Sequence, residues 1–192
     1  MTSTKTRLQQ LLSERILLLD GAMGTMIQAR RLSDAEFRGE RFADFPYDLA
    51  GNNDLLSLTQ PDIIREIHCA NLEAGADIIE TNSFNASPVG MMEFELDWET
   101  VREVNLAAVA NARKAAEEFS EKTPHRPRFV AGSMGPTAQQ TAISTRVEDP
   151  AYRGITFEEM EASYNLQAAA LVEGGVDILF PETVVDLSLI HI

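Results

Sequence analysis

The chain has 192 residues, 44% of them hydrophobic and 24% charged, which predicts one globular domain with a sizeable core. Its 30 acidic and 16 basic residues give a net charge of −14, so we expect no binding to nucleic acid and none to an anionic membrane. The sequence also lacks an apolar membrane span and a secretory signal. A single cysteine excludes an intrachain disulfide framework, and the expected location is therefore cytoplasmic.

The first half of the chain predicts two strands and two helices. Residues 5–14 are expected to form a short helix, and the apolar run that follows is typical of a buried parallel strand over 16–20. A polar, irregular stretch with several turn formers occupies roughly 30–60. Pro61 then begins a helix that ends at Gly75, and a second strand is expected over 77–81.

The second half repeats this alternation. A helix over 98–120 precedes a strand over 128–133, and a further helix begins at Thr156 with a capping box to Glu159 before a strand over 177–181. Alternating strands and helices predict a parallel α/β sheet with right-handed crossovers. Four strands cannot close an eight-stranded barrel, which typically takes about 250 residues. The chain is therefore expected to be either an open sheet or part of a barrel.

Two acidic residues occupy related places in the repeated pattern. Glu80 follows Asp77 by three residues, and Glu182 follows Asp177 by five. Both offsets are odd, so the alternation of side chains along a strand places the two glutamates on the same face relative to the matching aspartate. Because any two strand–helix units look alike, the pattern alone leaves a coincidence about equally open.

Candidate site residues lie where the strands end, since ligands of parallel α/β folds bind there. Asp20 ends the first strand, and the glycines within 21–25 allow a tight turn whose N–H groups form an anion-binding nest. Glu80 and Glu182 end the second and fourth strands. This set suits a zwitterionic amino acid, whose ammonium the carboxylates hold. It suits equally the two-carboxylate chemistry of a glycoside hydrolase.

A metal site is not expected. His68 and Cys69 are adjacent on a predicted helix, so their side chains point about 100° apart, and the helix faces away from the strand ends. We interpret Cys69 as a helix-packing residue. His125 lies between two prolines, and His191 lies near the end of the chain, so no spacing resembles a zinc site.

Five segments of the chain carry a further signal: ILLLDGAMGT, FRGERFADFPYDLAGNNDLLSLTQP, AGADIIETNSFN, VAGSMGPT and Leu171 to Thr183. They resemble the homocysteine-binding barrel of cobalamin-dependent methionine synthases. The resemblance runs in register from about Leu11 to Asp186, so we expect a homocysteine-binding domain over 1–186 and a non-family tail, from a junction or frame error, over 187–192. Three of the segments indicate only the wider homocysteine S-methyltransferase family, whereas RGERFADFPYDLAGNNDLL points to the cobalamin-dependent branch.

The resemblance implies a (β/α)8 TIM barrel of which about the first four βα units, a half-barrel, are present. It implies an enzyme that makes methionine, with homocysteine as substrate, zinc held by three cysteines, methylcobalamin as methyl donor, and cobalamin- and folate-binding modules as partners in the full-length protein. The implied substrate-binding residues, which would contact the ammonium and carboxylate of the amino acid, are Asp20, Gly21, Ala22, Glu80 and Glu182. Ala22 departs from the family's second glycine, yet it keeps its N–H if its φ stays negative.

Several alternatives stay open. The chain could belong to another homocysteine S-methyltransferase, dependent on betaine or S-methylmethionine, or to a carboxylate-pair glycoside hydrolase. The isolated chain could also be an inert, incomplete fragment. Because the family's zinc cysteines lie on later strands, we expect neither zinc nor cobalamin to bind this chain, and no catalytic residue within it.

Overall fold

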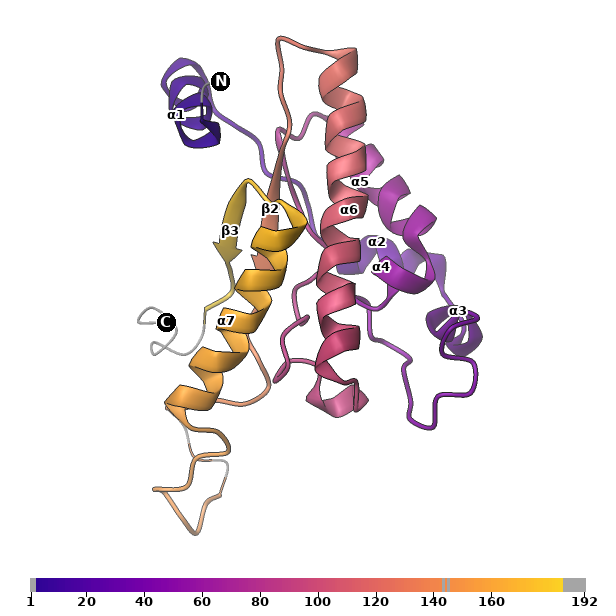
Figure 1. Ribbon diagram of the computed structural model, residues 1–192, viewed down its shortest axis with the longest axis vertical. Coiled ribbons are helices and arrows are strands. Elements are labelled where there is room, and N and C mark those ends of the chain that lie inside the picture. Colours follow the sequence, from indigo (N-terminus) through magenta and orange to yellow (C-terminus); the bar gives the residue numbers. More distant parts are fainter. Residues whose placement is uncertain (1–2, 143, 145, 185–192) are drawn as a thin grey trace.

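The structure, a computed structural model, describes residues 3–142, 144 and 146–184 and is an α/β fold (Figure 1). Three strands lie side by side in chain order: β1 (Ile78–Glu80), β2 (Phe129–Met134) and β3 (Ile178–Pro181). Both pairings are parallel, with Ile78 opposite Phe129 and Ala131 opposite Ile178. The strands predicted over 77–81, 128–133 and 177–181 are therefore confirmed.

The strand predicted over 16–20 is wrong as a regular strand. The segment does lie parallel to β1, but it forms only an isolated bridge between Leu19 and Ile78. Around this bridge the Ile78 N–H donates to the Leu18 carbonyl, and the Asp20 N–H donates to the Ile78 carbonyl.

On both sides of this bridge, a side-chain carboxylate accepts the main-chain N–H group that would form the next hydrogen bond of a regular ladder. The Leu18 N–H donates to the Asp77 carboxylate at 3.0 Å. At the other end the Glu80 N–H donates to both carboxylate oxygens of Asp20 at 3.1 Å. The ladder stops because these carboxylates occupy the positions where main-chain carbonyls would extend it.

All four predicted helices are present: α1 (Thr4–Glu14), α5 (Pro61–Ala74), α6 (Trp98–Lys122) and α7 (Phe157–Gly174). The predicted capping box joins Thr156 and Glu159. Gly75 ends α5 with φ 113°, a left-handed conformation that favours glycine. Within residues 3–142, 144 and 146–184, no helix combines the length and apolar character needed to cross a membrane.

The segment before α5 is more ordered than the expected irregular stretch. It contains three short helices, and η1 follows β1 at Met92–Phe94. Leu49, Leu55 and Leu56 are fully buried in it, so apolar side chains fix a segment whose turn formers suggested a polar surface. Its helices are too short to show periodicity in the sequence: α2 (Met23–Arg30), α3 (Asp34–Arg38) and α4 (Leu56–Thr59).

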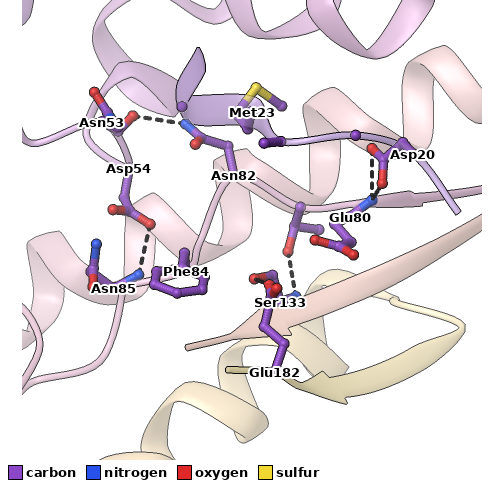
Figure 2. Close-up of a pocket in the computed structure, with 14 residues that line it drawn as sticks. Asp20, Met23, Asn53, Asp54, Glu80, Asn82, Phe84, Asn85, Ser133 and Glu182 are labelled. Atoms are coloured by element: carbon purple, nitrogen blue, oxygen red, sulfur yellow. Dashed lines mark hydrogen bonds between the residues drawn. The ribbon is translucent and has the colours of Figure 1, made fainter. Parts of the chain in front are cut away.

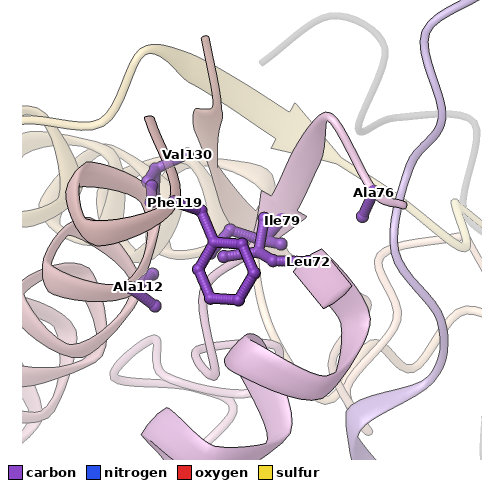
Figure 3. Packing of buried hydrophobic residues seen from close by; sticks show 8 residues of the cluster. Leu72, Ala76, Ile79, Ala112, Phe119 and Val130 are labelled. Carbon is purple, nitrogen blue, oxygen red and sulfur yellow. The ribbon is translucent and has the colours of Figure 1, made fainter. Parts of the chain in front are cut away.

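One part of the core lies between the sheet and the layer of α5, α6 and α7 (Figure 1), and another packs the segment before α5 against α5 and α6. In one cluster Leu72 of α5 and Phe119 of α6 pack with Ile79 of β1 and Val130 of β2 (Figure 3). Cys69 packs against this cluster, which agrees with its interpretation as a helix-packing residue. Ile79 and Val130 thus face the helices, while their neighbours along the strands face the opposite side of the sheet.

Exposed apolar residues lie at both edges of the sheet, in the 16–20 segment beside β1 and in β3. Ile16 is 82% exposed, Leu18 52% and Leu179 42%. Unpaired strand edges with apolar side chains favour association with other chains.

We therefore predict that the purified chain binds a hydrophobic dye and self-associates. The double variant Ile16→Thr/Leu18→Thr should reduce both effects, measured by dye fluorescence and light scattering. Val147→Thr is the matched control, since Val147 is 97% exposed but lies away from the sheet edges. A monodisperse monomer that binds no dye would contradict the prediction.

Candidate functional site

A cavity of about 270 Å³ lies at the carboxyl ends of the strands (Figure 2). The predicted convergence of the carboxylates is confirmed, since Asp20, Glu80 and Glu182 all line this cavity. Gly21 and Ala22 line it as well. The full lining is Asp20, Gly21, Ala22, Met23, Gly24, Asn53, Asp54, Glu80, Thr81, Asn82, Phe84, Asn85, Ser133 and Glu182.

Glu80 and Glu182 lie close enough in the cavity that Glu182 raises the pKa of the Glu80 carboxyl group. The odd spacing of each glutamate from its matching aspartate therefore correctly predicted that both lie on one face of the sheet. The Ser133 hydroxyl, on β2 between them, donates to Glu182. The neighbouring Glu182 therefore favours the protonated form of Glu80.

Buried hydroxyl and amide groups fix the strand ends beneath these acids. The Ser133 N–H donates to the Thr81 hydroxyl oxygen at 3.0 Å, and the Ser83 hydroxyl donates to the Ser133 carbonyl at 2.9 Å. The Gln167 side chain of α7 donates to the Ser83 carbonyl at 2.8 Å. This network ties the end of β1 to β2 and α7, so the base of the cavity is rigid.

The cavity is strongly acidic. None of its lining residues is Lys, Arg or His. Burial raises the pKa of Asp20 to about 7, with a smaller contribution from the charge of Glu182. Burial and then the charges of Glu182 and Asp20 raise the pKa of Glu80 to about 8. Carboxyl groups in such surroundings ionise readily only when a cation enters.

The start of α2 forms one wall of the cavity. The nest expected within 21–25 is wrong, because neither Gly21 nor Gly24 has a positive φ. Ala22 is instead the N-cap residue of α2, with the expected negative φ of −59° and no side-chain cap. The first N–H groups of a helix have no acceptor within it and carry a partial positive charge. This helix start offers the N–H donors that we attributed to a nest.

Sequence reasoning missed a second polar wall, contributed by the segment before α4. The Asn82 side chain donates to the Asn53 carbonyl at 2.8 Å, and the Asn85 N–H donates to the Asp54 carboxylate at 3.0 Å. Asp54 is buried, and desolvation raises its pKa to about 6. The only signal in the sequence was the family-specific GNNDLL run, which suggested a branch of the family and not a place in the site.

Phe84 is the aromatic residue of the cavity. Its carbonyl accepts the Gly135 N–H at 2.8 Å, and a Cβ added to Gly135 would lie 2.7 Å from its ring. A side chain at position 135 would thus displace the ring. The glycine after β2 is needed for this close approach.

Comparison with known proteins identifies the family. Residues 17–192, most of the chain, match the model of the homocysteine S-methyltransferases. The chain belongs to the homocysteine S-methyltransferase family. Solved structures of the Escherichia coli homocysteine methyltransferase MmuM are similar to it.

Three crystal structures of MmuM give the extent of the similarity. The metallated form is 28% identical with a TM-score of 0.71, and the match covers 94% of this chain and 58% of that one. The oxidized form is 29% identical with a TM-score of 0.71, and the match covers 94% of this chain and 57% of that one. The apo form is 27% identical with a TM-score of 0.58, and the match covers 88% of this chain and 50% of that one. This homocysteine S-methyltransferase chain thus spans about half of the matched enzyme's length.

The residues of this family member do not fit the three-cysteine zinc site that the resemblance implies. The sequence contains one cysteine and three histidines. Cys69 packs in the helix layer, and His68 is fully buried on the same helix. His125 is in the loop before β2, and His191 lies outside the described residues. Across the described part of the chain, no three His, Cys, Asp or Glu residues are placed to hold a metal.

The raised pKa values predict how stability depends on pH. Folding raises the pKa of Asp20 to about 7 from 3.8 and that of Glu80 to about 8 from 4.5. The folded state therefore binds more protons than the unfolded state from about pH 4 to 8. These groups make the free energy of unfolding fall as the pH rises through that window.

Glu80→Gln should raise the free energy of unfolding at pH 8 and leave it nearly unchanged at pH 4.5, as measured by thermal unfolding. We expect an increase of roughly 1–2 kcal/mol at pH 8, which is less than the full pKa shift implies because the side chain is partly exposed. Glu93→Gln, which removes an exposed carboxylate outside the cavity, is the matched control. Equal stabilisation at both pH values would contradict the explanation.

Proposed function

We propose that the cavity binds homocysteine for methyl transfer to its sulfur. One observation carries the proposal: four acidic residues, three of them at strand ends, line one cavity without a basic residue, beside an uncapped helix start. Family membership supports an amino-acid thiol as the ligand.

In this proposal the two charged ends of the amino acid bind opposite sides of the cavity. Asp20, Glu80 and Glu182 receive the ammonium group, whose three N–H donors match three acceptors. The first N–H groups of α2, near Gly21 and Ala22, receive the carboxylate. The bound ammonium group favours the ionised form of the acids, and its attraction to them offsets the free energy lost by burying their charges.

We further propose that the whole protein is a cobalamin-dependent methionine synthase and that this chain supplies about the first four βα units of its (β/α)8 barrel. The segment RGERFADFPYDLAGNNDLL supports this branch, and it contributes Asn53 and Asp54 to the cavity wall. A zinc ion would supply the thiolate by lowering the pKa of the bound thiol. Because this chain lacks the cysteines for it, we assign the chain the binding of the amino acid and not the activation of its sulfur.

A second candidate is a homocysteine S-methyltransferase of another branch, dependent on betaine or S-methylmethionine. The similarity to MmuM, which is a homocysteine methyltransferase, favours this candidate. The glycoside hydrolase alternative is not supported. The family that the chain matches acts on the thiol of homocysteine and not on a glycosidic bond.

Binding of homocysteine should release protons. The ammonium group lowers the raised pKa values of Asp20 and Glu80, so near pH 7 these groups give up protons to the buffer. Calorimetry at pH 7 in two buffers of different ionisation enthalpy measures the number released. We expect a net release that disappears in Glu80→Gln/Asp20→Asn, and proton uptake or no exchange in the wild-type chain would contradict the proposal.

The 192-residue chain should hold no stoichiometric zinc and form no methionine. The same chain extended through the rest of the barrel should bind one zinc, and with its further modules it should use methylcobalamin in preference to betaine or S-methylmethionine. Metal analysis after dialysis and a methionine assay with each donor test both statements. Zinc held by the short chain would contradict our assignment of roles, and transfer from S-methylmethionine or betaine alone would favour the second candidate.

A further inference from the structure

The side-chain amide of Asn53 lies beside the start of α2. It lines the same cavity as the three acids, and a Cβ added to Gly24, in the first turn of α2, would lie 3.8 Å from its Nδ2 (Figure 2). The amide therefore offers N–H donors next to the uncapped N–H groups of the helix.

The main chain of Asn53 is held independently of this amide. Its carbonyl accepts the Asn82 side chain at 2.8 Å and the Leu56 N–H at 3.2 Å. Among the described residues, its side-chain amide makes no hydrogen bond. The position of residue 53 is thus set by its main chain, and the amide is left available to a ligand.

The charges of the cavity decide which part of a ligand meets this amide. A carboxylate is repelled by the strand-end acids Asp20, Glu80 and Glu182, and it is attracted by the partial positive charge of the α2 start. The fourth acid of the lining, Asp54, accepts the Asn85 N–H at 3.0 Å. We propose that Asn53 is a specificity-determining residue, whose side-chain N–H donates to the carboxylate of the bound amino acid. This inference rests on the proposed function and adds a side-chain donor to the main-chain donors of α2.

The variants Asn53→Asp and Asn53→Ala distinguish ligand binding from a structural role. Asn53→Asp has nearly the same shape and keeps the main-chain contacts, but it faces the ligand carboxylate with a negative charge. A negative charge near a helix start favours the folded state, whereas the acids already in the cavity oppose it. We therefore expect little change in melting temperature for Asn53→Asp, with at least a tenfold loss of homocysteine affinity, on the order expected for a lost hydrogen bond to a charged group.

The decisive comparison uses 3-aminopropane-1-thiol, which is homocysteine without its carboxylate. Calorimetry should show that the wild-type chain prefers homocysteine. In Asn53→Asp this preference should be lost with little change in the affinity for the aminothiol, and Asn53→Ala should fall between the two. Asn165→Asp, which adds the same charge on the exposed side of α7, is the matched control and should behave as wild type.

The outcomes separate the inference from the function on which it rests. Equal weakening of both ligands by Asn53→Asp would show a structural role and overturn the inference. Unchanged homocysteine binding in that variant would overturn it as well while leaving the proposed function standing. If the wild-type chain binds neither ligand, the proposed function fails and the inference fails with it.

Discussion

The carboxylates of Asp77 and Asp20 hold the segment before α2 against β1, and the site depends on this attachment. Asp77 is fully buried and receives two hydrogen bonds from Arg15, at 2.7 and 2.8 Å, and one from Arg126 at 2.8 Å. Asp20 receives the Glu80 N–H. A buried carboxylate with such partners is strongly destabilising when one partner is removed. Side-chain pairing therefore replaces a regular strand where the chain enters the cavity.

This attachment gives Asp20 two roles that draw on the same oxygens. It fixes the main chain of Glu80, and it lines a cavity that also contains the acids Asp54, Glu80 and Glu182. Burial and the neighbouring charges raise the pKa values of Asp20 and Glu80 and so favour their protonated forms. An ammonium ligand would relieve both desolvation and mutual repulsion, so the feature that destabilises the empty site is the one that selects its ligand.

The sequence allowed the strand ends to be found but not the walls that other segments build between them. Alternation along a strand was enough to place Glu80 and Glu182 on one face, because parity depends only on local geometry. The strand over 16–20 failed because Asp77, some 60 residues away, takes the N–H that a regular ladder would use. Asp54 was missed for a similar reason, since its partner is the main chain of Asn85, 31 residues later.

The central claim is that the three acids recognise an ammonium group, and a paired titration tests it most directly. Homocysteine and N-acetylhomocysteine share the thiol and the carboxylate, but the acetyl group removes the positive charge. Calorimetry on the 192-residue chain at pH 8 should show binding of homocysteine and at least a tenfold weaker interaction with the acetylated compound, the order expected for a lost charge-assisted contact. Equal affinity for the two compounds would contradict the account.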